Sequence, residues 1–370
     1  MVIAIIDDVL QIEHINKQNS ISLYKVLNGK LESVEKSQSR KMVNVISHST
    51  LCSMIILSAD VQVIHIQIYD KEKNARIDDL ITALNFCVQK KVDIISLSIG
   101  STKLSDWMKI KKLFSEIKSI GIIVVAAQCN QNMITIPVCL ENVIGVASTE
   151  SIGRNICCVE ENRWGINLLV PLKQYLPSEL AKRKDVVGNS YAVPIIIREF
   201  CKYAETRRCL PTIEILNSFL EQYSVIDVVS INKEMRRQHT SVQKVPYIFW
   251  KDENFFKKNL ILEVMNGLQK KYGIETICIV YDEPTDVRFI RYGKDWIEDD
   301  INNNFYSKVD LIMVAPGNEL DNAIKKEIDI TVTIEDNSCV LTGENEERKR
   351  LYDTDNSLKL CDTIVEMLSE

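Results

Sequence analysis

Residues 188–194 read Gly188-Asn189-Ser190-Tyr191-Ala192-Val193-Pro194, and the apolar run Ile195-Ile196-Ile197 follows directly. The glycine permits a tight turn with close backbone approach, and Pro194 is tolerated in the first turn of a following helix. Ser190 would therefore lie at the positive end of a helix dipole, where developing negative charge is favoured. Because Gly-x-Ser before a helix is also an ordinary N-cap, this stretch indicates catalysis only if partner groups occur elsewhere.

The composition is that of a globular protein long enough for two domains. The 370 residues are 46% hydrophobic and 26% charged, and 45 basic against 51 acidic side chains give a net charge of −6. This acidic balance argues against nucleic acid or an anionic membrane surface as a partner. The longest apolar runs are far shorter than the roughly 20 residues of a membrane span.

The cysteines and the N-terminal residues together predict a compartment. Residues 1–8 lack the basic lead and the cleavage pattern of a signal peptide. Eleven cysteines without an export signal predict free thiols in a reducing environment, and the cytoplasm is the expected location. With no Cys-x-x-Cys spacing and only four histidines, a zinc site is not expected. No cofactor is expected either, and no loop of the sequence identifies the ligands of a calcium site.

Short apolar runs alternate with amphipathic stretches through the first 150 residues. Val2–Ile6 ends in Asp7 and Asp8, the pattern of a buried parallel strand with polar groups at its carboxyl end. Strands are also predicted at 61–69, 92–99, 122–127 and 143–147, with helices at 77–88 and 107–117. This order predicts a doubly wound, largely parallel α/β sheet. Residues 11–40 are polar and irregular, and we predict an exposed connection with a little helix.

Polar side chains fall where the predicted strands end or helices begin, namely at Asp7, His48, Ser98 to Gly100 and Asn130. Such positions meet at one edge of an open α/β sheet, where sites collect. Taken alone, Asp7 would be a loop carboxylate or helix cap, and a lone histidine is more often structural than a base. The other histidines, His14, His65 and His239, lack comparable surroundings, and we interpret them as structural.

With these motifs in the order Asp, His, Ser, the chain resembles the subtilisin-like (S8 family) serine peptidases. Val2–Asp8 resembles the strand that ends in the family's catalytic aspartate, and His48-Ser49-Thr50 resembles its His-Gly-Thr helix start. Residues 124–130 resemble the strand that delivers the oxyanion asparagine. Gly188–Pro194 resembles Gly-Thr-Ser-Met-Ala-x-Pro, and the segments 92–100 and 142–146 also resemble family strands. The resemblance covers residues 1 to about 225 and implies a subtilisin-like fold.

The resemblance also implies an activity and roles for four residues. The chain would be a serine endopeptidase with Ser190 as nucleophile and His48 as general base and then acid. Asp7 would hold the imidazole in its tautomer, and Asn130 would donate a hydrogen bond to the tetrahedral oxyanion. The expected partner is a peptide or protein substrate, and homo- or hetero-oligomers are both compatible with the sequence.

Substrate recognition is implied at two stretches. Ser98-Ile99-Gly100 would pair with an extended peptide by strand addition. Ala127-Gln128-Cys129 would lie at the primary specificity pocket, where Gln128-Cys129 replaces the family's Ala-Gly. We hypothesise that these larger side chains narrow the pocket or make it polar, so that cleavage is selective rather than digestive. The predicted function is selective processing of a peptide precursor, with removal of its leader, as in bacterial systems that mature ribosomally made peptides (RiPPs).

Three further departures from the family surround the proposed triad. Asp7-Asp8-Val9 replaces Asp-Thr/Ser-Gly, Ser49 replaces the glycine after the histidine, and Tyr191 replaces methionine. None of them removes a catalytic group, so we favour an active enzyme. They also motivate an alternative, a catalytically inactive pseudopeptidase that binds a peptide or a partner enzyme in the same groove.

We predict a peptidase domain at residues 1–225, a polar linker at 226–244 and a smaller α/β domain at 245–370. Strands of the last domain are predicted at 245–250, 276–281, 309–315 and 328–334, and helices at 254–272 and 357–369. Lys308–Val314 resembles the acidic-strand region of nucleotide-binding folds, but the segment 251–257 has no glycine to wrap amides around a phosphate. We interpret this domain as a degenerate nucleotide-binding-like module that positions the peptide, rather than an NTPase. Because Asp7 lies near the start, no pro-segment is expected, and narrow specificity or the second domain would restrain activity.

Overall fold

The computed structural model describes most of the chain: residues 1–16, 20–36, 46–70, 74–102, 106–130, 135–140, 143–150, 152–160, 165–226, 245–251, 258–280, 289–291, 309–315, 328–335, 338–343, 348–351 and 357–369. It divides into two compact units, Met1–Ser101 with Met108–Arg237, and Gln238–Glu370 with Thr102–Trp107. Residues 227–244 of the predicted linker lie outside the described residues.

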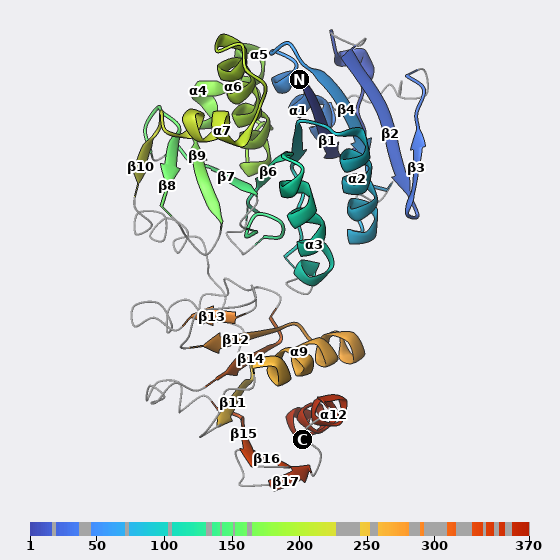
Figure 1. Cartoon of the computed structure of the whole chain (residues 1–370), viewed down its shortest axis with the longest axis vertical. Coiled ribbons are helices and arrows are strands. Elements are labelled where there is room, and N and C mark those ends of the chain that lie inside the picture. Colours follow the sequence, from blue (N-terminus) through green and yellow to red (C-terminus); the bar gives the residue numbers. More distant parts are fainter. Residues whose placement is uncertain are drawn as a thin grey trace. The chain divides into compact units, whose positions relative to one another are not determined.

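The first unit is built on a large sheet whose described strands run in the order β10-β8-β9-β7-β6-β5-β1-β4-β2-β3 (Figure 1). Every pair from β9 across to β2 is parallel, whereas β3 and β8 pair antiparallel with their neighbours β2 and β9. The predicted doubly wound parallel sheet is confirmed. The bounds are β1 Val2–Asp7, β2 Ile21–Leu27, β3 Lys30–Ser33, β4 Gln62–Gln67, β5 Ile94–Leu97, β6 Ile123–Ala127, β7 Ile144–Ser148, β8 Cys157–Val159, β9 Ile166–Val170 and β10 Ser224–Ile226.

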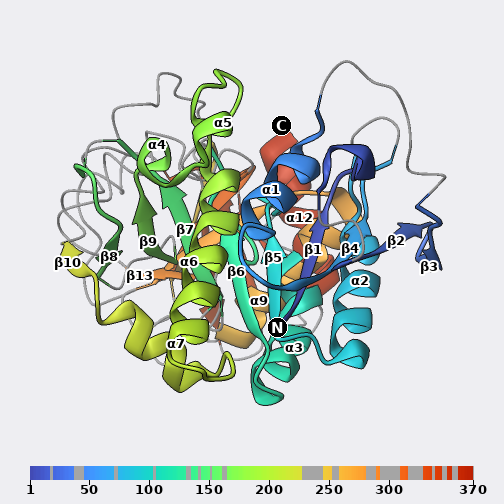
Figure 2. The ribbon, with the colours of Figure 1, turned by 90° about the horizontal axis from the view of Figure 1, so that it is seen from above.

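Helices cover both faces of this sheet, and alternating residues of β1 show which face each group covers. Ile3 and Ile5 point into the core shared with α1 and α6, while Ala4 and Ile6 are equally buried on the other face. Figure 2 shows α2 and α3 on the side of the sheet opposite α6. The bounds are α1 His48–Ile56, α2 Ile77–Lys90, α3 Asp106–Ser119, α4 Leu172–Tyr175, α5 Ser178–Ala181, α6 Ala192–Thr206 and α7 Ile213–Leu220, with short 3-10 turns η1 Ile12–His14 and η3 Asn189–Tyr191.

The prediction for residues 11–40 is wrong, because the segment contributes a β-hairpin to the sheet. β2 pairs parallel with β4 and antiparallel with β3. Ile21 and Leu23 are buried on either side of the exposed Ser22, which is the period-two pattern of a half-buried strand, and Val26 is buried further along. The turn is Asn28-Gly29, with φ of 51° and 75°, and Asn-Gly is a strong signal for a tight hairpin.

The second unit contains a smaller sheet of its own, in the order β13-β12-β14-β11-β15-β16-β17. The strands from β13 to β15 are parallel, and β16 and β17 add an antiparallel extension that the sequence pattern does not predict. This confirms a second, smaller α/β arrangement. The bounds are β11 Tyr247–Lys251, β12 Thr276–Val280, β13 Phe289–Arg291, β14 Leu311–Val314, β15 Ile330–Glu335, β16 Ser338–Gly343, β17 Arg348–Leu351, α9 Lys258–Tyr272 and α12 Ser357–Ser369.

The first strand of this unit is followed by residues 252–257, so the predicted glycine-free loop and the start of the helix predicted at 254 lie outside the described residues. The helix is described from Lys258, and Val264 and Leu268 on it are buried against the sheet. Within the described part of the chain, no helix combines the length and apolar character needed to span a bilayer.

Candidate active site

Three side chains from distant parts of the sequence form a continuous hydrogen-bonded row. Asp7 is the last residue of β1, His48 is the first of α1, and Ser190 lies in η3 directly before α6. His48 Nδ1 lies 2.9 Å from Asp7 Oδ2, and His48 Nε2 lies 2.8 Å from Ser190 Oγ. Because a carboxylate only accepts, Nδ1 carries the proton and Nε2 is left to accept from the serine hydroxyl. The geometry therefore places a hydroxyl, an imidazole and a carboxylate in the order that a nucleophile, a base and an orienting group require.

The start of α1 is fixed to the end of β1 by capping bonds. Ser47 is the N-cap, and its Oγ accepts from the N–H of Thr50 at 3.3 Å and donates to the carbonyl of Val9 at 2.6 Å. Asp8 Oδ1 accepts from the N–H of Ser49 at 2.8 Å. This second carboxylate therefore caps the helix that carries His48. Burial and then the neighbouring Asp7 carboxylate raise the pKa of Asp8.

His48 is held in a partly enclosed position, with 27% of its side chain exposed against 3% for Asp7. Burial alone disfavours the imidazolium, but the neighbouring Cys52 sulfur and the hydrogen bond to Asp7 favour it, and the net result is a raised pKa of His48. Burial also raises the pKa of the Cys52 thiol, which keeps that group neutral near pH 7. We therefore assign the raised pKa of His48 to Asp7.

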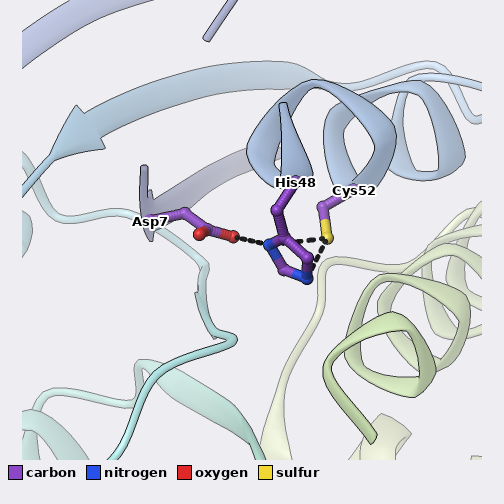
Figure 3. A group of neighbouring side chains, drawn as sticks. All are labelled: Asp7, His48 and Cys52. Atoms are coloured by element: carbon purple, nitrogen blue, oxygen red, sulfur yellow. Dashed lines mark hydrogen bonds and ion pairs between the residues drawn. The ribbon is translucent and has the colours of Figure 1, made fainter. Parts of the chain in front are cut away.

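Cys52 is a neighbour of the row that the sequence reading did not identify. It lies one helical turn after His48, and its Sγ is 3.8 Å from Nδ1 and 3.7 Å from Nε2 (Figure 3). The signal was available, because residues four apart on a helix share a face. Among the described residues, Asp7, His48 and Cys52 form a group whose ligand atoms lie within 4.8 Å of one another, so a cation there would compete with the hydrogen bonds of His48.

His65 is a buried structural histidine, as interpreted from the sequence. It lies on β4 with 2% exposure, and its Nε2 is 2.7 Å from Oγ of Ser49, the residue that replaces the family's glycine. Burial lowers the pKa of His65 to about 4. The Ser49 hydroxyl thus satisfies a neutral imidazole behind the start of α1.

The free energy of unfolding is expected to fall as the pH falls from 6.5 towards 4, because His65 can gain a proton only in the unfolded state. The difference in pKa corresponds to about 3 kcal/mol, present in full above pH 6.5 and lost through this range. The free energy of unfolding, measured with urea, should differ less between pH 7 and pH 4.5 in His65→Gln than in wild type. The control is His14→Gln, at an exposed position, which should keep the wild-type difference between the two pH values. An equally large difference in His65→Gln would contradict the assignment of this pH dependence to His65.

The turn before Ser190 requires its glycine. Gly188 has φ of +108°, a region that L side chains rarely adopt, and a Cβ there would lie 3.0 Å from Asn130 Oδ1. The next residues form η3, and α6 begins at Ala192, so Ser190 does stand at the start of an apolar helix. The ring of Tyr191 packs against His48, with centroids 4.9 Å apart and planes tilted by 48°.

The structure places Asn130 beside this turn. Its Oδ1 accepts from the backbone N–H of Asn189 at 2.9 Å, which leaves Nδ2 as the donor of the amide. Asn130 follows β6 and is exposed, in keeping with a group that faces a bound molecule. The predicted oxyanion donor and nucleophile are thus on adjoining loops.

Of the predicted substrate-binding residues, Ser98 contacts Ser190. Its Oγ donates to the Ser190 carbonyl at 3.1 Å, beyond the end of β5. Ile99 is 7% exposed, and a Cβ on Gly100 would lie 2.4 Å from Thr135 Cγ2, so this segment packs closely on residues 135–136. Its pairing with a peptide stays a prediction.

The other predicted substrate-binding residues continue β6 towards Asn130. Ala127 and Gln128 are buried, at 6% and 2% exposure, and Cys129 is half-buried. The carbonyls of Gln128 and Cys129 accept from Asn189 Nδ2 at 3.0 and 3.2 Å. Asn189 thus contacts this stretch directly, a role that the sequence reading missed.

A known protein family matches nearly the whole chain. The family model for the Subtilase family matches residues 1–356. No sequence among the curated proteins matches the chain.

Solved structures of similar fold include three peptidases. The nisin leader peptidase NisP from Lactococcus lactis is 14% identical, with a TM-score of 0.45 over 63% of this chain and 87% of its own. The prenylagaramide maturation protease PagA is 15% identical, with a TM-score of 0.42 over 57% and 78%. The epidermin leader peptide processing serine protease EpiP from Staphylococcus aureus is 14% identical, with a TM-score of 0.42 over 56% and 66%.

Proposed function

Because the chain belongs to the subtilase family and is therefore a serine endopeptidase, we propose that it cleaves peptide bonds with Ser190 as nucleophile, His48 as general base and Asp7 as the orienting carboxylate. The observation that carries this proposal is the row of two hydrogen bonds, 2.9 Å from Asp7 to His48 and 2.8 Å from His48 to Ser190. Both distances are within the range needed for proton transfer and orientation.

In the first half of the reaction, Ser190 Oγ attacks the carbonyl carbon while its proton passes to His48 Nε2. Asp7 stabilises the imidazolium that forms, and Asn130 donates to the oxyanion of the tetrahedral intermediate. Collapse breaks the C–N bond, and the imidazolium returns its proton to the leaving amine. The acyl-serine is then hydrolysed by a water molecule that His48 deprotonates in the same way.

We propose a peptide precursor as the substrate, from which a leader is removed. Support for a selective site comes from Gln128 and Cys129, which place side chains where the family has Ala-Gly. Ser98-Ile99-Gly100 would pair with the extended peptide beside Ser190. All eleven cysteines are free thiols, which suits a reducing compartment such as the cytoplasm.

The residue that reacts can be identified without knowing the natural substrate. A fluorophosphonate is attacked only by an activated serine, so we expect native protein to be labelled on Ser190 alone, and heat-denatured protein to be unlabelled. Digestion and mass spectrometry would locate the adduct. If the native, folded protein is not labelled, the pseudopeptidase alternative replaces this proposal.

A further inference from the structure

The side chain of Asn189 joins three segments of the chain around the nucleophile. Its Nδ2 donates to the carbonyls of Gln128 and Cys129 after β6, at 3.0 and 3.2 Å. Its Oδ1 accepts from both the backbone N–H and the hydroxyl of Ser148 at the end of β7, at 2.7 and 3.0 Å. Asn189 itself begins η3 and is 7% exposed.

These partners fix which way the amide of Asn189 points. The backbone N–H of Ser148 can only donate and the two carbonyls can only accept, so Oδ1 must face Ser148 and Nδ2 must face the carbonyls. Both hydrogens of Nδ2 and two accepting directions of Oδ1 are then used. A side chain whose bonding capacity is filled inside the protein holds its backbone in one place.

The backbone of Asn189 transmits this position to Asn130. Its N–H donates to Asn130 Oδ1 at 2.9 Å, so the same residue sets both the direction of the Asn130 amide and the path of the chain into Ser190. The adjoining Gly188 leaves little spare room, since a Cβ there would lie 3.0 Å from Asn130 Oδ1. Asn130 and Ser190 therefore cannot shift independently while Asn189 is in place.

We propose that Asn189 is a positioning residue that aligns the oxyanion donor Asn130 with the nucleophile Ser190, an inference that rests on the proposed function. Threonine, which the resembled family motif has at this place, carries one hydroxyl donor and could not bond both carbonyls at once. Asn189 thus contacts Gln128-Cys129, a stretch that also differs from the family's Ala-Gly.

The test is a double-mutant cycle on the reaction with a fluorophosphonate, with the maximal inactivation rate, kinact, and the half-saturating concentration, KI, measured separately. Asn130→Ala is expected to lower kinact by about 10²–10³-fold, a figure taken from subtilisin. Asn189→Ala should lower kinact by about 10²-fold, the cost of about 1 Å of misplacement, with KI nearly unchanged. In the double variant the two effects should fall well short of multiplying, because part of the effect of Asn189 passes through Asn130.

A matched control separates positioning from general loosening of the fold. Asn167 Oδ1 accepts from the N–H of Gly145 at 2.7 Å between β9 and β7, so Asn167→Ala breaks a comparable bond and should lower Tm without lowering kinact. If Asn189→Ala does not fold, the same cycle is run with Asn189→Asp, which keeps the acceptors and loses both donors.

Each outcome of the cycle has one meaning. Multiplied effects in the double variant, or an unchanged kinact in Asn189→Ala, would overturn the positioning role while leaving the proposed function standing. A wild-type protein that is folded but never reacts would overturn the proposed function, and the positioning role with it.

Discussion

Replacing Ser190 by alanine is expected to reduce the maximal rate of peptide cleavage by about 10⁶-fold, a factor measured in subtilisin. The hydroxyl that accepts the acyl group is lost, and within the described part of the chain no other hydroxyl is hydrogen-bonded to His48. Binding should survive, because the cavity left by one oxygen atom changes little else. Mass spectrometry of a pool of synthetic peptides gives the rate of cleavage by each protein. Fluorescence anisotropy of an intact peptide that the wild type cleaves then gives its affinity for Ser190→Ala.

The matched control is Ser119→Ala, which removes an exposed hydroxyl that donates to the Glu116 carbonyl at the end of α3. Its cleavage rate should equal that of wild type. A Ser190→Ala protein that still cleaves the same peptides at a comparable rate would show that another residue is the nucleophile, or that a contaminating peptidase was measured.

Replacing Asp7 by asparagine is expected to lower the maximal rate by about 10⁴-fold. The amide can donate to Nδ1, which would turn the imidazole into the tautomer that cannot accept from Ser190. The same change should move the acid limb of the pH profile. In wild type the raised pKa of His48 means that activity is lost on acidification at a pH above the ordinary histidine value of about 6.5.

Without the carboxylate the pKa of His48 falls, so the acid limb of Asp7→Asn should lie at lower pH than that of wild type. The control is Asp78→Asn, an exposed carboxylate in the first turn of α2, which should change neither rate nor limb. An acid limb at the same pH in wild type and Asp7→Asn would contradict the assignment of the raised pKa to Asp7.

The parallel sheet could be predicted because buried strands produce continuous apolar runs, as in Val2–Ile6, and polar residues then mark the edge where they end. The hairpin of β2 and β3 was missed because its strands carry many polar residues at the rim of the sheet. The information was present in the alternation of Ile21, Ser22 and Leu23 and in the Asn28-Gly29 turn.

In the candidate site, too, some residues could be predicted from the sequence and others could not. Asp7, His48, Ser190 and Asn130 were identified because each stands in a local motif. The bonds of Asn189 were not predictable, since they depend on where the carbonyls of Gln128 and Cys129 face after folding. A side chain that acts only through contacts across the sheet has no signature in its own neighbourhood.

The hydrogen bond between His48 and Ser190 joins residues 142 positions apart. Between them the chain must form β4 to β7 and β9 before α6 can close on the sheet. Ribosomal synthesis runs from the N-terminus, and contacts between distant residues form late. A growing chain that ends at β9 contains Asp7 and His48 but does not yet contain Ser190. On the proposed mechanism such a chain cannot cleave a peptide, and cleavage becomes possible only after η3 and α6 have packed on the sheet.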